Sequence, residues 1–373
     1  MLANEARNRA GVAAIGSLGG GSITSIFGFM LTPALRSKRS VKLLVIAGTL
    51  LYGLGLGTAA ASTRYWHLLL TQGVIAGVGN GLVQYPLATI APEYFSGRSG
   101  KAMGLITAAS GLGGLTYAPI IRMMLKNLGT RKTLGLLSLI NLSTCGTIAY
   151  FAQPPRKVKA RCATVPWKFA KEPVFILTIF VNLLSTLAIN IPMALGPDFS
   201  RALGYSAGIG ALLLAVNNGI GSPSRIAIGH IADKIGHQNT LFVAMAIITL
   251  TTWILWLVGA MIGTKCMWLT FIIIHGLLGG AFSTLCGNVT VQLFGHEMYF
   301  ASAGIFSCAR GVGYLAGVPI AGAILGDVKD RDAIPQDFGG MIVYVGSLLL
   351  ICTACILAVR ILDGRKKGWK LIA

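Results

Sequence analysis

Residues 224–240 read SRIAIGHIADKIGHQNT and place charged side chains, among them Asp233 and Lys234, directly after a long apolar run. A second apolar run begins at about residue 239, so these charges separate two hydrophobic segments. Charged side chains are costly inside a bilayer and are expected where a helix leaves it. Gly229 allows close packing of the first helix, and Gly236 permits a tight turn into the next one. The stretch therefore predicts two membrane-spanning helices joined by a short turn.

The composition of the whole chain supports the same class. Of the 373 residues, 54% are hydrophobic and only 11% are charged. Soluble domains carry about 25% charged residues, and about 20 apolar residues cross a bilayer as a helix. We predict an all-α multi-pass membrane protein with eleven spans, near residues 11–35, 41–61, 66–91, 102–121, 133–153, 173–195, 205–229, 239–262, 267–290, 301–325 and 340–360.

The cysteines and the acidic residues indicate no catalytic chemistry. Most of the seven cysteines lie in or beside apolar runs, and Cys352 and Cys355 form one CxxC pair within a predicted span. Free cysteines in such positions behave as small hydrophobic residues. The chain has neither an HExxH motif nor paired acidic residues in the middle of a span. We therefore expect no enzyme activity, no disulfide framework, no metal site and no cofactor.

The distribution of basic residues predicts the orientation. The basic loop 154–172 divides the chain into five predicted spans before it and six after it. Cytoplasmic loops of membrane proteins carry an excess of lysine and arginine, so we place this loop and the basic C-terminus in the cytoplasm. The net charge of +20 is then a topology signal rather than a nucleic-acid surface. We predict an N-terminal half at 1–153, a cytoplasmic linker at 154–172 and a C-terminal half at 173–373.

Two halves joined by a basic loop, together with Gly229, Asp233, Lys234 and Gly236, resemble the major facilitator superfamily and its GxxxD(R/K)xG gating pattern. Asp233 is then expected to accept hydrogen bonds from the N-terminus of a facing helix or to pair with an arginine. The first-half copy of the pattern is degraded, because Thr32 stands where the aspartate is expected. That superfamily has twelve helices, so the resemblance implies that this chain lacks the first helix and starts with the second; a genuine eleven-span protein and a wrongly assigned start are the alternatives.

Two further stretches narrow the resemblance. Residues 77–120, with YFSGRSGKAMG followed by ASGLGG and YAP, and residues 301–325 resemble fungal monocarboxylate-transporter-like proteins. This resemblance implies a secondary transporter whose two halves open a central site to one side of the membrane at a time. Arg225 matches an arginine of that family, whereas Gly221 stands where its acidic partner is expected. The residues that this family uses for proton-coupled monocarboxylate transport are therefore not all present in this chain.

Polar residues within the predicted spans are the candidates for contact with a solute, because such residues usually face a cavity. Arg310 lies deep in its span and indicates an anion, while Arg225 is open to two interpretations, a solute contact or part of the cytoplasmic gate. His275 is interpreted mainly as a structural residue. The candidate solute-contacting residues are Arg310, Arg225, Asn217, Asn218, Asn80, Gln84, Tyr85 and Tyr117.

These features predict a transporter that moves a small organic solute, for example an organic anion such as a monocarboxylate, with proton coupling left open. We expect it to lie in the plasma membrane, to act as a monomer in the lipid bilayer and to have no nucleic-acid partner. Two alternatives remain open. One is an exporter of a secondary metabolite, and the other is a sensor-like or transport-incompetent relative without the first helix.

Overall fold

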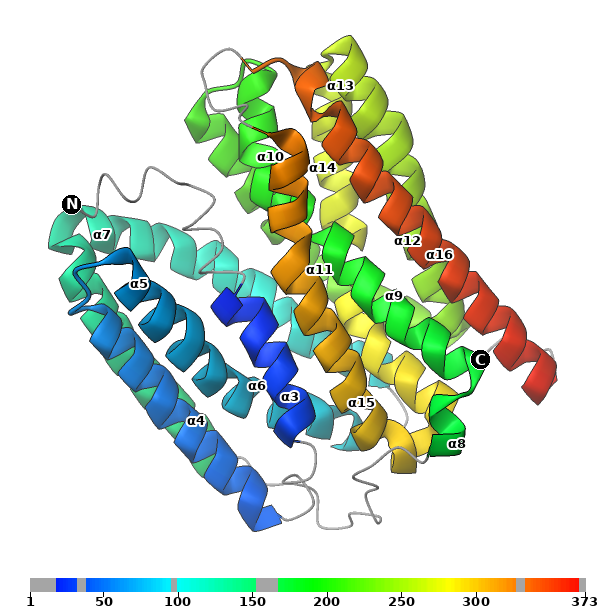
Figure 1. The fold of residues 1–373 in the computed structure, drawn as a ribbon, viewed down its shortest axis with the longest axis horizontal. Coiled ribbons are helices and arrows are strands. Elements are labelled where there is room, and N and C mark those ends of the chain that lie inside the picture. Colours follow the sequence, from blue (N-terminus) through cyan, green and yellow to red (C-terminus); the bar gives the residue numbers. More distant parts are fainter. Residues whose placement is uncertain (1–17, 32–37, 95–98, 152–166, 327–332, 369–373) are drawn as a thin grey trace. The chain divides into compact units, whose positions relative to one another are not determined.

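The computed structural model describes residues 18–31, 38–94, 99–151, 167–326 and 333–368, and these residues form helices and no strands. The predicted all-α class is therefore confirmed for this part of the chain. Thr32 of the degraded first motif and most of the basic linker lie outside the described residues. The chain divides into two compact units, which are described separately below (Figure 1).

The first unit contains Met1–Tyr94, Tyr117–Phe169 and Phe294–Leu315. Within it, α4 packs along α6, and a Cβ on Gly79 of α6 would overlap the backbone of Tyr52 on α4. The Ser138 hydroxyl of α7 donates to the Gly53 carbonyl over 2.7 Å. Its elements are η1 (Leu18–Ile23), α3 (Thr24–Leu31), α4 (Lys38–Ala59), α5 (Tyr65–Leu68), η3 (Leu69–Ile75), α6 (Ala76–Tyr94) and parts of α7 (Ser99–Phe151) and α15 (Ala281–Leu325).

The second unit contains Phe95–Thr116, Ala170–Leu293 and Ala316–Ala373. In it α9 lies beside α16, and α11 packs on α14 (Figure 1). Besides its parts of α7 and α15, it comprises α9 (Pro173–Ile189), α10 (Ile191–Ala202), α11 (Ala207–Ile235), α12 (His237–Thr251), η4 (Thr252–Leu257), α13 (Val258–Ile262), α14 (Lys265–Leu278), η5 (Pro335–Phe338) and α16 (Gly339–Lys367); the short α8 (Trp167–Ala170) spans the boundary between the units.

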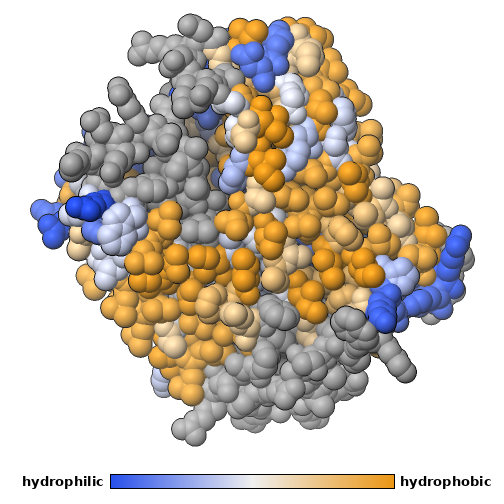
Figure 2. All heavy atoms as spheres, in the orientation of Figure 1, coloured by the Kyte–Doolittle hydropathy of each residue, from blue (hydrophilic) through white to orange (hydrophobic). Residues whose placement is uncertain are grey.

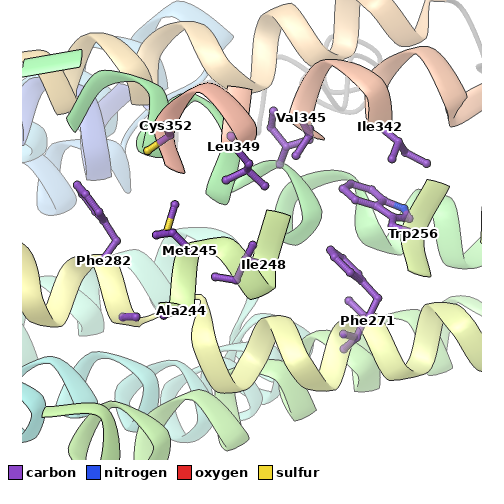
Figure 3. Packing of buried hydrophobic residues seen from close by; sticks show 14 of the residues in the cluster. Ala244, Met245, Ile248, Trp256, Phe271, Phe282, Ile342, Val345, Leu349 and Cys352 are labelled. Carbon is purple, nitrogen blue, oxygen red and sulfur yellow. The ribbon is translucent and has the colours of Figure 1, made fainter. Parts of the chain in front are cut away.

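An apolar core holds the second unit together. Trp256 stacks on Phe271 with ring centroids 5.1 Å apart, and both side chains are fully buried. Met245 and Ile248 of α12 lie near Leu349 of α16 in the same cluster (Figure 3). Burial of each such side chain contributes about 1.5–3 kcal/mol where the alternative is water. This core fixes the positions of α11 and α12, which carry the site described below.

Glycine and proline break the long helices at defined points. Gly129 in α7 and Gly295 in α15 have φ values of 74° and 76°, a conformation that residues with a Cβ rarely adopt. Each of these two helices is therefore a pair of helices joined at a glycine. Asn190 separates α9 from α10, where Pro192 lacks the N–H that would continue the helix.

Seven of the described helices are long and apolar enough to cross a membrane. Of these, Ser99–Phe151 has 53 residues, about 80 Å at 1.5 Å per residue, which is enough for two crossings of a core about 30 Å thick. Hydrophobic residues cover most of the helix surface in Figure 2, and hydrophilic ones gather at the helix ends. The multi-pass class is thus supported, and the count of eleven spans stays a prediction.

The two compact units differ from the two halves predicted from the sequence. The start of α7 belongs with α11 in the second unit, and the middle of α15, Phe294–Leu315, belongs with α3 in the first unit. In the first unit, for example, a Cβ on Gly311 of α15 would lie 2.8 Å from the Ser22 carbonyl oxygen. The sequence halves at 1–153 and 173–373 remain a proposal about how the protein works, because compactness in one conformation does not test it.

Candidate functional site

The start of α7 and the end of α11 meet in the second unit, and several hydrogen bonds join them there. Asp233, near the C-terminal end of α11, accepts hydrogen bonds from the backbone N–H groups of Gly100 and Lys101, over 2.8 and 2.9 Å. These N–H groups belong to the first turn of α7, where no carbonyl of the same helix can pair with them. The Asp233 carboxylate of α11 therefore caps the N-terminus of a different helix, α7, and is attracted by its partial positive charge. We call this contact the α7–α11 latch.

Small residues let the two backbones approach closely enough for the latch to form. A Cβ on Gly229 would overlap the carbonyl oxygen of Gly100, and one on Gly104 would lie 2.5 Å from the carbonyl oxygen of Arg225. Further along the interface, a Cβ on Gly111 would overlap the Ser222 hydroxyl. Glycine at these positions is thus a steric requirement of the observed packing, as in close helix pairs in membranes.

Arg225 belongs to the same interface. One guanidinium nitrogen, Nη1, donates to the Thr107 carbonyl over 2.8 Å and to the Ser110 hydroxyl over 2.7 Å, both on α7. The side chain also packs on Gly280, where a Cβ would lie 2.7 Å from Arg225 Cγ. Gly280 lies in the break between α14 and α15, so Arg225 of α11 contacts both α7 and this break. The structure therefore places this arginine in the α7–α11 contact.

The turn after Asp233 positions the next helix. Gly236 has a φ of 98° and a ψ of 139°, which only glycine adopts without strain, and it ends α11 and precedes α12. His237 follows at the first position of α12. Its Nε2 lies 3.3 Å from Asp233 Oδ1, and its Nδ1 lies 3.1 Å from the Gln292 side-chain nitrogen. Lys234 is exposed beside this turn.

Asn217 and Asn218 lie two turns deeper on α11. The Asn217 side-chain amide donates to the Ile272 carbonyl over 2.9 Å and lies 3.3 Å from His275 Nδ1, so it bonds α14. The Asn218 carbonyl accepts from Ser222, and its side chain is half-buried. Gly221 packs tightly on the same helix, since a Cβ there would lie 3.2 Å from the Gly276 carbonyl oxygen.

The remaining candidates lie in the first unit, where the described side-chain contacts do not join them into one cluster. Asn80 donates to the Thr24 hydroxyl over 3.3 Å, and Arg310 donates to the Ser307 hydroxyl over 2.7 Å. Tyr85 is buried, whereas Gln84 and Tyr117 are exposed. The solute-contacting roles of these residues therefore stay predictions.

Sequence reasoning placed the gating residues Gly229, Asp233 and Gly236 at a helix end, and the structure shows their contacts. It missed the α7 side of the latch, namely Gly100, Gly104, Thr107 and Ser110. The signal was present in the sequence, because Gly100, Gly104, Ala108 and Gly111 follow one another at intervals of three or four, on one face of a helix. What the sequence could not supply was the identity of the facing helix.

The fold and this site define a multi-helix membrane protein with a polar latch at the end of a helix pair. The sequence matches the Major Facilitator Superfamily over residues 7–317. The chain belongs to this superfamily, and the predicted superfamily is confirmed, while the narrower monocarboxylate-transporter-like assignment is not.

Similar curated proteins are fungal transporters. The MFS transporter asaE of Aspergillus flavus is 26% identical over 358 residues, which cover 94% of this chain and 78% of that protein. The agnestins efflux protein AgnL12 of Paecilomyces divaricatus is 25% identical and covers 92% and 77%. The riboflavin transporter MCH5 of Saccharomyces cerevisiae is also 25% identical and covers 87% and 65%.

Solved structures support the fold alone, because their sequence identity is low. The E. coli fucose:proton symporter FucP has a TM-score of 0.66 at 11% identity, covering 93% of this chain and 90% of that one. A bacterial homologue of the iron transporter ferroportin, in an outward-facing state, has a TM-score of 0.63 at 16% identity and covers 90% and 88%.

Replacement of Arg225 tests its place in the interface. We expect Arg225→Lys to weaken the α7–α11 contact, because the lysine side chain is one atom shorter and its nitrogen does not reach the position of Nη1, which donates to both Thr107 and Ser110. Loss of one hydrogen bond to a charged group costs about 1.5–3 kcal/mol. Thermal unfolding of the purified protein in detergent measures this effect, with Arg131→Lys, at an exposed position of α7, as the matched control. A variant as stable as the parent would contradict the assignment.

Proposed function

We propose that this protein is a secondary transporter that moves a small organic solute across a membrane by alternating access, and that the α7–α11 latch closes its cytoplasmic side. The observation that carries the proposal is the Asp233 carboxylate on the N-terminus of α7. This contact joins helices from the two sequence halves, 1–153 and 173–373, at the C-terminal end of α11. It can therefore close one end of a path and release it again.

The strength of the latch suits a switch. Two charge-assisted hydrogen bonds contribute on the order of 1.5–3 kcal/mol each, and part of this is offset by water when the latch opens. A few kcal/mol between two states leaves the minor state populated and reachable. The energy of solute binding or of a coupled ion is then sufficient to shift the equilibrium.

The charges around the latch support its placement in the cytoplasm. Lys366 at the end of α16 pairs with Glu172 over 2.8 Å, and Lys367 pairs with Asp363 over 2.8 Å. Gln238, which follows the latch turn, donates to Asp363 over 2.9 Å, so the end of α16 and the turn lie together. The positive-inside rule then favours a cytoplasmic C-terminus. We further propose the plasma membrane as the location and a monomer as the working form.

Two classes of solute are candidates, a secondary metabolite and an organic anion. Export of a secondary metabolite is favoured by the similarity to a protein named for agnestins efflux, and the similarity to a riboflavin transporter also points to larger organic solutes. An organic anion is favoured by Arg310 alone, because Arg225 is engaged with α7 in this structure. A small monocarboxylate is accordingly the narrower and less supported version of the proposal.

Transport by secretory vesicles or cells carrying the protein tests the anion proposal. We expect Arg310→Ala to lower the initial rate for labelled lactate, an anion, about tenfold or more, since a half-buried arginine–anion pair contributes more than 1.4 kcal/mol, and to leave the rate for riboflavin, which is uncharged at neutral pH, unchanged. Arg310→Lys keeps the charge and is expected to retain part of the rate. Equal lactate rates for parent and Arg310→Ala would remove this residue from the site. Absence of movement of either solute, with a latch that opens normally, would favour export of a different solute or a sensor-like relative.

A further inference from the structure

We propose that His237 is a proton-binding site that controls the α7–α11 latch, so that acidification of the cytoplasm weakens the latch. The inference rests on the proposed function only in regarding the latch as a gate. It begins from the position of the imidazole, which lies between the latch carboxylate and a second polar side chain.

His237 is largely buried, with 11% of its side chain exposed, and it is the residue that starts α12. Its Nε2 lies 3.3 Å from Asp233 Oδ1, the same oxygen that accepts from the Gly100 N–H over 2.8 Å. One carboxylate oxygen is therefore shared between the N-terminus of α7 and the imidazole ring. A change of charge on the ring acts on the latch directly.

The second partner of the ring fits both protonation states. Gln292 of α15 lies with its side-chain nitrogen 3.1 Å from His237 Nδ1, which makes Nδ1 the acceptor of a neutral ring. Within the described part of the chain, Gln292 Oε1 is buried without a hydrogen-bond partner. Rotation of this amide by half a turn would present Oε1 to Nδ1, where it accepts the proton of a charged ring.

The charged side chains around the ring come from three helices, α7, α11 and α16. Among the described side chains, α11 contributes Asp233 and the exposed Lys234, and α7 contributes the exposed Lys101. On α16, Lys367 donates to the Gln292 carbonyl and pairs with Asp363, whose other oxygen accepts from Gln238. Asp363 is thus already engaged by Lys367 and Gln238. Asp233 is the carboxylate in direct contact with the imidazole.

The sign of the effect follows from this arrangement. With a neutral ring, no cation competes with the N-terminus of α7 for the Asp233 carboxylate. With a protonated ring, a positive charge stands 3.3 Å from the same carboxylate and close to the N-terminus of α7, which it repels. Histidine is the side chain that ordinarily changes charge between pH 5 and pH 8, so protonation of this ring is the change that acidification brings to the latch.

Amide hydrogen exchange of the purified protein measures how often the latch opens, and it requires no solute. We expect the protection factors of the Gly100 and Lys101 amides, each corrected for intrinsic exchange at its own pH, to fall about fivefold from pH 8 to pH 6. His237→Gln keeps a neutral polar side chain and is expected to stay protected across the range. His237→Arg carries a permanent charge and is expected to show low protection at both values.

The same pH dependence in His237→Gln as in the parent would overturn the proposal, as would a rise in protection on acidification. Full protection of His237→Arg at pH 8 would also contradict it. Asp233→Asn removes the charged partner and is expected to abolish the pH dependence. Because exchange reports only the latch, a failure here is distinct from a failure to find a transported solute.

Discussion

Asp233→Ala is expected to release the N-terminus of α7 and to raise the exchange rate of the Gly100 and Lys101 amides about 30-fold or more. The alanine side chain removes both acceptors, so two N–H groups in the first turn of α7 lose their partners. A loss of about 2 kcal/mol, which is less than the sum of two charge-assisted hydrogen bonds because water partly replaces them, corresponds to this factor. Hydrogen exchange followed by mass spectrometry of the peptide that begins at Ser99 measures it.

The control for this prediction is Asp198→Ala. Asp198 is a carboxylate of the same unit that pairs with Arg201 on α10, and both side chains are more than a third exposed. We expect this variant to leave the α7 amides unchanged. An Asp233→Ala protein whose Gly100 and Lys101 amides exchange at the parental rate would show that the carboxylate does not hold α7 in solution.

Gly229→Ala is expected to separate α7 from α11 through steric overlap. The added Cβ would overlap the Gly100 carbonyl oxygen, which belongs to the backbone and does not rotate away. Overpacking of this kind costs about 1–3 kcal/mol, more than the roughly 1 kcal/mol that alanine gains over glycine in a helix. We expect faster amide exchange over residues 99–111 and a lower thermal unfolding temperature.

The matched control is Gly113→Ala on α7, where an added Cβ meets nothing within 4 Å. This variant gains helix propensity without a clash, so its unfolding temperature is expected to stay equal or to rise. If both alanine variants behaved alike, the close approach of α7 and α11 would not matter to the folded state.

The helical class and the position of the latch motif were predictable from the sequence, because both depend on local patterns. Runs of apolar residues predict spans, and Gly229, Asp233 and Gly236 mark a helix end by their own chemistry. The expectation that Asp233 meets the N-terminus of a facing helix is matched by its bonds to α7. Its role as a gate stays a proposal.

The identity of partners was not predictable, because it depends on which helices meet in space. The sequence predicts that the Asn217 amide faces a solute, yet in the structure this amide donates to the Ile272 carbonyl of α14. From the sequence, Arg225 lacks an acidic partner. In the structure it donates hydrogen bonds to a carbonyl and a hydroxyl of α7 instead. A Cβ on Gly221 would lie 3.2 Å from the Gly276 carbonyl oxygen, so a larger side chain at this position would require α11 and α14 to shift slightly apart.

The central claim is that the latch closes the cytoplasmic side of a transport path, and the accessibility of Ser222 tests it most directly. Ser222 is buried, with 1% exposed, at the α7–α11 interface against Gly111. In a chain otherwise free of cysteine, Ser222→Cys is treated with a membrane-impermeant thiol reagent from the cytoplasmic side of sealed vesicles. We expect slow labelling when Asp233 is present and about tenfold faster labelling when Asp233→Asn is added, with no change for Asp198→Asn. Equal labelling rates with Asp233 and with asparagine at that position would contradict the account.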